Sequence, residues 1–277
     1  MEFLDYYSIE HGGMRKKKLT GTFNNFTYLA KYYQFPVFYR REIELWNENP
    51  DYKGIPLQMY IFLNRLEYVN KLPDELSIWQ IMSAMTISGV MKGYSRFNAK
   101  LMDKFCKKYN IKSLYDPCSG WGERALYCFY NNIKYFGIDV NMNLFKGYRE
   151  MVEDLKMTNV SLNYGESSSY DLKDLKTDVT FTCPPYYNTE IYSVDGIENY
   201  SLDNFLDWWN NVIENSKSTE SKYFVFQINQ KYKEMMSKIV IKNGFKFIEE
   251  IKDEKIMKSH FTPNKKEYES VMIFERI

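Results

Sequence analysis

Strand-like and helix-like segments alternate along the sequence from about residue 111 onward, and this alternation limits the possible folds more than any other feature. Parallel strands joined by helical crossovers produce such an order, so it predicts an α/β domain built on a mostly parallel sheet. The last two segments flank a Thr-Pro-Asn-Lys-Lys turn, which predicts an antiparallel hairpin at the end of the sheet. The predicted strands are residues 112–116, 134–140, 159–165, 177–183, 222–229, 245–256 and 267–276.

Apolar side chains recur at helical spacing between these strands. A helix is expected to begin near Glu123, and residues 143–157 carry apolar side chains on one face. Residues 201–216 begin with a capping serine and also repeat apolar residues at helical spacing, so we interpret their tryptophan pair as mostly core. A further helix is expected to end at Asn243, because Gly244 follows it.

Residues 1–90 have a different pattern, rich in aromatic side chains and without alternating strands. Their clearest segments, 55–72 and 74–89, have the apolar spacing of helices. We therefore predict two parts, a helical N-terminal extension at 1–90 and an α/β domain at 91–277. The basic run at 15–18 is interpreted as a solvated face rather than a phosphate site.

Composition places the chain among ordinary globular proteins. Apolar residues make up 44% and charged residues 26% of the sequence, and no apolar run reaches the ~18 residues that suggest a membrane span. The N-terminus carries acidic residues where a signal peptide needs basic ones, so we expect an intracellular, cytoplasmic protein. The cysteines lie far apart and only two histidines are present, so neither a disulfide framework nor a metal site is expected.

The charges nearly balance, with 37 basic and 36 acidic residues. Strong non-specific binding to a polyanion needs many phosphate contacts, so this balance argues against such a binder but allows a local basic face. Heavy use of lysine, asparagine, tyrosine, isoleucine and phenylalanine suggests an A·T-rich coding source such as a phage, a virus or a low-GC bacterium.

A glycine-containing loop, residues 116–125 (DPCSGWGERA), follows the first predicted strand and opens a helix. Its Gly120-x-Gly122 spacing is typical of nucleotide-binding turns, because glycine lets the main chain turn sharply against a ligand. Asp139 closes the second predicted strand, where a carboxylate can accept hydrogen bonds from both ribose hydroxyls. The alternative is a tight strand-to-helix turn that binds nothing.

The charges of this loop indicate which ligand it would bind. A phosphate favours a helix N-terminus without negative charge, yet this loop carries Asp116 and Glu123. Carboxylates suit a ligand with an ammonium or a sulfonium group. S-adenosylmethionine carries both groups and no phosphate, whereas NAD fits less well.

A second unusual stretch, FTCPPYY at residues 181–187, ends the fourth predicted strand. Strand ends at the carboxyl edge of a parallel sheet face the same crevice, so this turn is expected beside the loop at 116–125. Two prolines fix the backbone and leave carbonyl groups without an adjacent N–H donor. The Pro184 carbonyl can therefore accept a hydrogen bond from an exocyclic amine, while Tyr186 offers a face for base stacking.

Four segments together form a more specific pattern: 93–105 (GYSRFNAKLMDKF), 115–126 (YDPCSGWGERAL), 135–141 (YFGIDVN) and 181–193 (FTCPPYYNTEIYS). This pattern resembles the amino-methyltransferases that modify adenine N6 or cytosine N4 in DNA. It is most similar to phage-type DNA methylases, including those fused to ParB-like proteins, over roughly residues 90–277. The resemblance implies a Rossmann-like class I methyltransferase fold, S-adenosylmethionine as cofactor and DNA as partner.

The resemblance also implies roles for individual residues. Asp139 would hold the ribose, and the target base would be received by Cys183, Pro184, Pro185 and Tyr186. The rest of the cofactor would be contacted by Ser95, Phe97, Asp116, Pro117, Ser119, Gly120, Gly122, Gly165, Glu166 and Ser167. The first two would close over the methionine moiety, the loop residues would cradle the methionine end, and the last three would lie near the adenine ring.

The implied reaction needs positioning rather than a covalent enzyme intermediate. An exocyclic amine is a poor nucleophile, and acceptors at its protons favour in-line attack on the sulfonium methyl group. Related enzymes usually place Asp, Asn or Ser before the two prolines, whereas this chain has Cys183, whose thiol is a weak acceptor. Either the Pro184 carbonyl suffices, or the thiol replaces a serine imperfectly, or the chain has kept binding and lost catalysis. A nucleophile of the cytosine-C5 type is not expected, because those enzymes use a Pro-Cys order.

We expect adenine N6 in DNA as the target, with cytosine N4 second. Methylation of an adenine in RNA, a catalytically silent nucleic-acid-binding subunit and a NAD-linked enzyme are the alternatives. DNA contacts are expected from residues 1–90, short loops or a partner subunit. A duplex substrate would require base flipping, in which Tyr187 and Tyr192 either hold the extruded base or simply pack. His260 is interpreted as a structural or surface residue.

Overall fold

The computed structural model describes residues 5–10, 13–18, 99–185, 202–252 and 269–277, with a few isolated positions between 26 and 48. Contacts divide the chain into two units, one formed by Met1–Arg96 with Lys258–Lys265 and the other by Phe97–Met257 with Lys266–Ile277. The predicted boundary at residue 90 lies outside the described residues, and each unit is described by itself.

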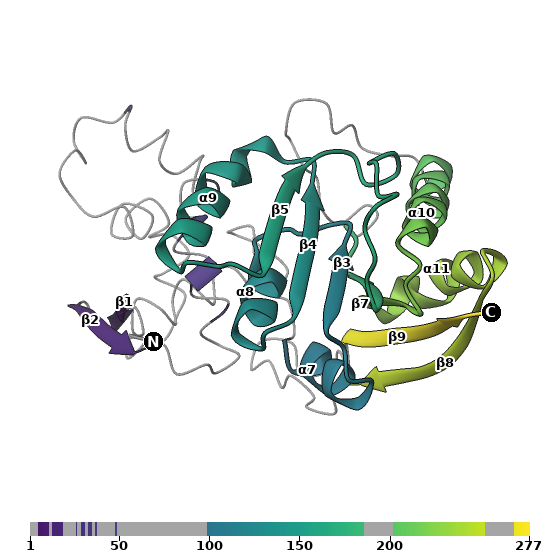
Figure 1. The fold of residues 1–277 in the computed structure, drawn as a ribbon, viewed down its shortest axis with the longest axis horizontal. Helices are drawn as coiled ribbons and strands as arrows, with labels where there is room; N and C mark the ends of the chain where they lie inside the picture. Colours follow the sequence, from purple (N-terminus) through teal and green to yellow (C-terminus); the bar gives the residue numbers. More distant parts are fainter. Residues whose placement is uncertain are drawn as a thin grey trace, which may run out of the picture. The chain divides into compact units, whose positions relative to one another are not determined.

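The second unit is built on a seven-stranded sheet with the strand order β5-β4-β3-β6-β7-β9-β8 (Figure 1). The strands from β5 to β7 run parallel, and β9 lies antiparallel between β7 and β8. This confirms the predicted Rossmann-like fold class, a mostly parallel sheet with a C-terminal antiparallel hairpin. The strands are β3 (Ser113–Asp116), β4 (Lys134–Asp139), β5 (Val160–Tyr164), β6 (Val179–Thr182), β7 (Tyr223–Asn229), β8 (Phe245–Lys252) and β9 (Glu269–Arg276).

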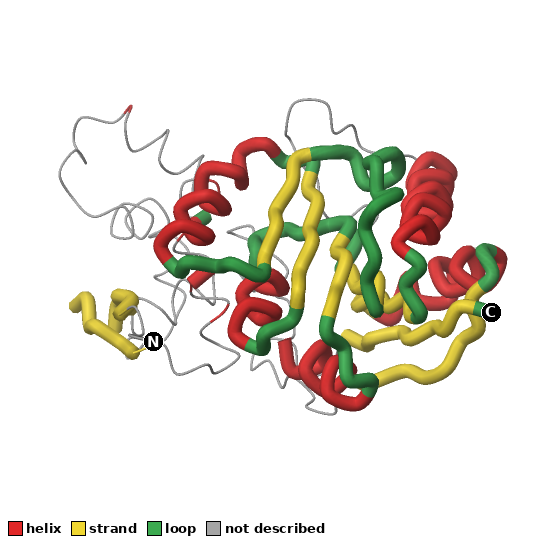
Figure 2. Tube along the Cα trace, in the orientation of Figure 1, coloured by secondary structure: helices red, strands yellow, loops and turns green. Residues whose placement is uncertain are grey.

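Helices connect these strands (Figure 2). They are α7 (Ala99–Lys108), α8 (Glu123–Tyr130), α9 (Phe145–Asp154), α10 (Leu202–Ser216) and α11 (Gln230–Lys242), with short 3-10 turns η2 (Met142–Leu144) and η3 (Lys217–Thr219). The helix expected at 143–157 is shorter because its first turn is 3-10 and Lys156 adopts a left-handed φ of 51°. Gly244 adopts φ 86° just after α11, which confirms its predicted role at the helix end.

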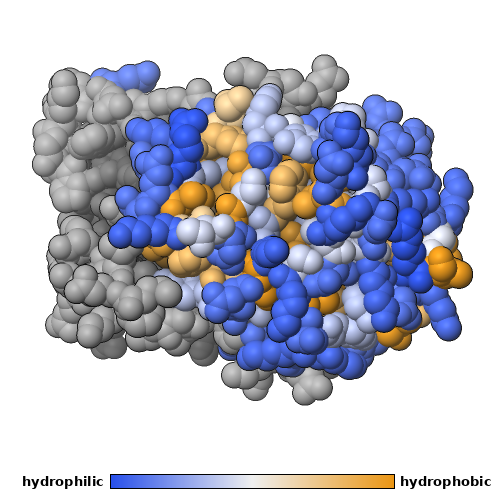
Figure 3. Space-filling view, in the orientation of Figure 1, coloured by the Kyte–Doolittle hydropathy of each residue, from blue (hydrophilic) through white to orange (hydrophobic). Residues whose placement is uncertain are grey.

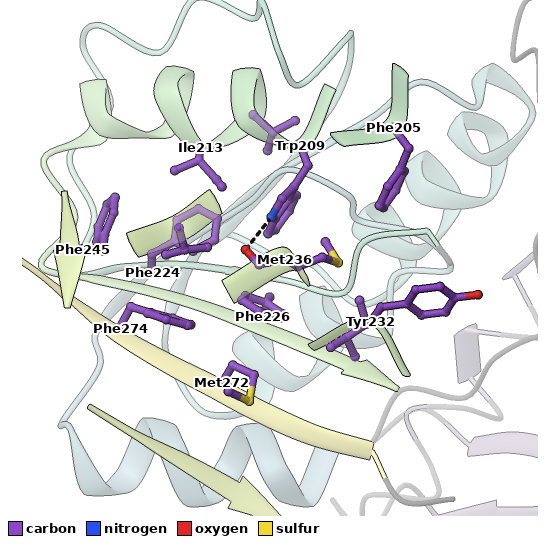
Figure 4. Packing of buried hydrophobic residues seen from close by; sticks show 13 residues of the cluster. Phe205, Trp209, Ile213, Phe224, Phe226, Tyr232, Met236, Phe245, Met272 and Phe274 are labelled. Atoms are coloured by element: carbon purple, nitrogen blue, oxygen red, sulfur yellow. Dashed lines mark hydrogen bonds between the residues drawn. The ribbon is translucent and has the colours of Figure 1, made fainter. Parts of the chain in front are cut away.

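The core on one face of the sheet is aromatic (Figure 4). Phe224 and Phe226 of β7 point toward α10 and α11, and the Trp209 indole packs edge-on against both rings. Trp209 is fully buried and its indole N–H donates to the carbonyl of Met236 at 3.3 Å. On the opposite face, Phe105 of α7 packs against Phe181 of β6. Trp209 therefore confirms the interpretation of the tryptophan pair as mostly core.

The segment between β5 and β6 covers the sheet without forming a helix. Leu172 is buried against Tyr115 of β3 and Ile138 of β4, and Phe136 and Leu175 are half-buried beside them. On the face seen in Figure 3, hydrophobic residues gather at the middle of the described part and hydrophilic residues surround them. On this side of β3 and β4, the sheet is therefore covered by a loop rather than by a helix.

The described part of the first unit contains an antiparallel hairpin of β1 (Asp5–Glu10) and β2 (Gly13–Lys18). These strands correct the prediction for residues 5–18, which assigned only helices to the extension. Glycine pairs favour tight hairpin turns, and the sequence has glycines at 12 and 13. The basic run at 15–18 lies on β2. The helices predicted at 55–72 and 74–89 lie outside the described residues.

Among the helices that the structure describes, none combines the length and the apolar character that crossing a bilayer requires.

Candidate functional site

The carboxyl ends of three neighbouring strands bring together the two main sequence motifs. β3 lies between β4 and β6, and all three run parallel. Asp116 ends β3, Asp139 ends β4, and Cys183 directly follows β6. The Gly-containing loop and the Cys-Pro-Pro turn therefore meet at one edge of the sheet, as predicted from parallel-strand geometry.

The loop from Asp116 to Gly122, called the cofactor loop below, depends on two glycines. Gly120 has φ 58° and Gly122 has φ 89°, values in the left-handed region that side-chain-bearing residues rarely adopt. The Tyr148 hydroxyl donates to the Gly120 carbonyl. A Cβ at Gly122 would lie 3.1 Å from Cε of Met151. Both partners come from α9, so this helix supports the loop.

Asp139 contacts the cofactor loop from the neighbouring strand. Its Oδ2 accepts the Gly120 N–H at 2.8 Å, and its Oδ1 accepts the Asn141 N–H at 2.9 Å. Burial raises the pKa of this carboxyl to about 6, although the two backbone donors act in the opposite direction. Carboxylate oxygens have further lone pairs, and the side chain is only half-buried. Asp139 can therefore accept hydrogen bonds from a ligand diol.

Asp116 lies beneath the loop rather than on its surface. Its side chain is fully buried. Oδ2 accepts from Arg124 Nε at 2.5 Å and from the Tyr135 hydroxyl at 2.7 Å, and Oδ1 accepts the Cys118 N–H at 3.1 Å. Both oxygens are thus engaged by the protein. The sequence analysis placed Asp116 against the methionine end of the cofactor and did not identify Arg124 or Tyr135.

The cofactor loop also packs closely against β4. The Ser119 N–H donates to the Ile138 carbonyl at 2.9 Å, and the Ser119 hydroxyl lies 3.2 Å from that of Tyr135. A Cβ built on Gly137 would lie only 2.1 Å from the Ser119 Oγ. Glycine at this strand position is therefore required for the loop to reach the sheet. Ser119 and the neighbouring Pro117 are both buried.

The Cys-Pro-Pro turn lies beside this loop. Cys183 and Pro185 are half-buried, and Pro184 is buried. Cys183 lies close enough to Arg124 to contribute to the raised pKa of that guanidinium. Burial raises the pKa of the Cys118 thiol well above its usual range, so this neighbour is a neutral thiol. Six residues named from the sequence lie outside the described ranges. Ser95, Phe97 and Tyr186 were predicted site residues, and Tyr187, Tyr192 and His260 had no assigned role.

The loop after β5 is the third segment at this edge of the sheet. Asp139 and Tyr164 are register partners, and the Gly165 N–H donates to the Asp139 carbonyl at 3.1 Å. Glu166 is exposed, and its Oε1 accepts from the Trp208 indole N–H at 3.0 Å. Ser167 is buried. Trp208 of α10 is thus a contact of a predicted site residue that the local sequence pattern did not reveal.

Comparisons with known proteins give structural likenesses only. No family model matches the chain, and no curated protein matches it. Among solved structures, a SAM-dependent methyltransferase from Aquifex aeolicus is similar with 15% identity and a TM-score of 0.46, covering 66% of this chain and 100% of that one. TrmN from Thermus thermophilus is similar with 10% identity and a TM-score of 0.45 over 63% of this chain, which spans about half (48%) of TrmN.

The [4+2]-cyclase SpnF is also similar, with 9% identity and a TM-score of 0.47 over 64% of this chain and 80% of that one. Identities this low say nothing about activity, and a cyclase stands among the likenesses beside methyltransferases. The function proposed below therefore rests on the residues of this chain.

Proposed function

We propose that the protein transfers a methyl group from S-adenosylmethionine to the exocyclic amine of a nucleic-acid base, with adenine N6 in DNA as the preferred target. One observation supports this most: the cofactor loop, Asp139 and the Cys-Pro-Pro turn lie at adjacent strand ends of one parallel sheet. A cofactor subsite and a base subsite would then share one crevice.

The charges at this edge favour S-adenosylmethionine over a dinucleotide. Asp139 ends β4, Glu166 follows β5, and Glu123 lies in the first turn of α8. A helix N-terminus that binds a diphosphate usually lacks such carboxylates. In this proposal Asp139 accepts the ribose hydroxyls, the glycines of the cofactor loop face the methionine end, and Glu166 with Ser167 lies at the adenine.

The transfer itself follows from positioning. The amine nitrogen forms a bond to the methyl carbon while the sulfur–methyl bond breaks, which leaves S-adenosylhomocysteine and a protonated amine that releases a proton to solvent. The Pro184 carbonyl accepts a hydrogen bond from the amine, because no proline N–H competes for this part of the turn. Orientation and electrostatics supply the rate enhancement, without a covalent intermediate.

Replacing Cys183 tests the acceptor in this site. A thiol is a weak acceptor, so Cys183→Ser and Cys183→Asp should preserve or raise the turnover number measured by methyl transfer. Cys183→Ala provides the matched control, since it keeps the turn and removes the acceptor. Complete loss of transfer in the Ser and Asp variants would contradict the proposal and show that the thiol itself is required.

Target recognition is proposed to come from residues 1–90, short loops or a partner subunit. Affinity for DNA depends largely on contacts between basic side chains and phosphates. Deleting residues 1–90 should therefore weaken DNA binding, measured by fluorescence anisotropy, by about tenfold or more, because several such contacts are lost. Unchanged affinity and site preference in the truncated protein would contradict this assignment.

A second candidate is a nucleic-acid-binding subunit without catalysis, and the cysteine before the two prolines favours it. Matched DNA and RNA oligonucleotides, offered with isotope-labelled cofactor, separate the possibilities. We expect label in DNA. Label in RNA alone would move the proposal to an RNA adenine. Absence of S-adenosylmethionine binding in calorimetry, with no label in either polymer, would favour the silent subunit.

A further inference from the structure

Arg124 is a charged residue buried at the centre of the edge described above. It lies in the first turn of α8, and only 6% of its side chain is exposed. Its Nε donates to Asp116 Oδ2 at 2.5 Å. One of its terminal nitrogens donates to the Cys118 carbonyl. A single side chain therefore contacts both the start and the middle of the cofactor loop.

The same guanidinium lies near the Cys-Pro-Pro turn. Register pairs Leu114 with Val179 and Tyr115 with Thr180, so the ends of β3 and β6 are neighbours. Cys183 directly follows β6 and lies close enough to Arg124 to contribute to the raised pKa of the guanidinium. Arg124 therefore binds the loop after β3 and lies near the turn after β6.

Asp116 holds this arginine in place. Burial alone would lower the pKa of Arg124, but the adjacent carboxylate of Asp116 raises it well above its usual range, so the side chain stays charged. Tyr135 donates to the same carboxylate oxygen at 2.7 Å, and the Cys118 N–H donates to the other oxygen. Both carboxylate oxygens of Asp116 are thus hydrogen-bonded within the protein, which explains how the charge can be buried.

We propose that Arg124 is a positioning residue that holds the cofactor loop and the Cys-Pro-Pro turn in register, with Asp116 as its anchor rather than as a ligand of the cofactor. Its function in catalysis rests on the methyl transfer proposed above. By fixing the Cys118 carbonyl at the strand end next to β6, it sets the distance between the methyl donor and the target amine. Small misplacements of reacting groups lower the rate far more than they lower binding.

Arginine is needed here because of the shape of its donors. A guanidinium presents several N–H groups in a rigid plane, whereas a lysine ammonium is one compact charge on a flexible chain. Lysine at this position could pair with Asp116 but could not also bind the Cys118 carbonyl in the same geometry. Arg124→Lys therefore separates the charge of the residue from its positioning role.

The test measures three properties of the full-length protein: cofactor affinity by calorimetry, the turnover number on DNA, and the alkylation rate of Cys183 followed by peptide mass spectrometry. Arg149→Lys is the matched control, because Arg149 is an exposed arginine on α9. For Arg124→Lys we expect cofactor affinity close to that of the wild type. We also expect a turnover number lowered by about 10- to 100-fold and faster alkylation of Cys183. The buried Cys106 and Cys128 should show unchanged alkylation.

A second variant keeps the test decisive if Arg124→Lys folds poorly. Asp116→Asn combined with Arg124→Met removes both charges, which buried ion pairs often tolerate. It should keep cofactor binding, lose turnover and expose Cys183. Equal losses of affinity and turnover with unchanged Cys183 alkylation would overturn the inference, since the pair would then only stabilise the fold. If no nucleic acid accepts methyl, the proposed function fails, while the affinity and alkylation measurements still decide the positioning role.

Discussion

Replacing Gly137 with alanine should lower the affinity for S-adenosylmethionine by about 100-fold, or ~2.7 kcal/mol. The new Cβ would lie 2.1 Å from Ser119 Oγ, 2.6 Å from Tyr135 Cε1 and 2.9 Å from the Tyr135 hydroxyl. Neither neighbour can remain in place at these distances. Ser119 belongs to the cofactor loop, and Tyr135 donates to Asp116 beneath it. One added methyl group therefore displaces both the loop and the side chain that supports it.

Calorimetric titration with S-adenosylmethionine measures this effect, and thermal unfolding measures the accompanying loss of stability, about 1–3 kcal/mol for overpacking. Gly244→Ala is the control. Gly244 has no heavy atom within 4 Å of a built Cβ but a φ of 86°, so its replacement strains the backbone away from the site. The control should lose stability and keep affinity. Equal affinity in the wild type and Gly137→Ala would contradict the placement of the cofactor against this loop.

Replacing Asp139 with asparagine should also lower cofactor affinity by up to about 100-fold, because hydrogen bonds to a charged group contribute roughly 1.5–3 kcal/mol. The carboxylate accepts N–H groups from Gly120 and Asn141. The amide nitrogen of asparagine cannot accept, so one of these donors or the ligand hydroxyl loses its partner. Cofactor affinity at pH 8 measures this change.

The pH dependence of Asp139 gives opposite signs for stability and binding. Burial raises its pKa from 3.8 to about 6 in the folded protein. Protonation therefore favours the folded state, and this stabilisation is lost as the pH rises through about 6. Cofactor binding needs the ionised carboxylate, so wild-type affinity should fall as the pH drops through about 6. Affinity in Asp139→Asn should not change in this range. A wild-type affinity independent of pH between 5 and 8 would contradict the ribose-binding role.

The sheet could be predicted from the sequence because its determinants are local. Each parallel strand is a short apolar segment between polar turns, and the observed β4 and β7 begin and end within one residue of their predicted bounds. The end of α11 followed from Gly244 for the same reason. The hairpin at residues 5–18 was missed, because the extension showed no alternating strands and its clearest segments, 55–72 and 74–89, had the apolar spacing of helices.

The candidate site could be predicted only in part. Gly120 and Gly122 have the left-handed backbone that their spacing suggests, and Asp139 ends its strand beside them. Trp208 was not found, because its partner Glu166 is 42 residues away in the sequence. Arg124 lies in the same loop as its partner Asp116, eight residues on, but loop spacing alone does not show that the two side chains pair. The burial of Asp116 beneath the cofactor loop likewise depends on side-chain contacts across strands that no local pattern contains.

Nucleoside mass spectrometry of DNA incubated with the protein and isotope-labelled S-adenosylmethionine tests the central claim most directly, since it reports the activity, the base and the modified position together. The proposed site predicts labelled N6-methyladenine, formed by the wild type and lost with the Gly137→Ala variant. The result that would contradict it is the absence of any labelled, methylated exocyclic amine in both DNA and RNA. This holds under conditions in which the protein is folded and saturated with cofactor.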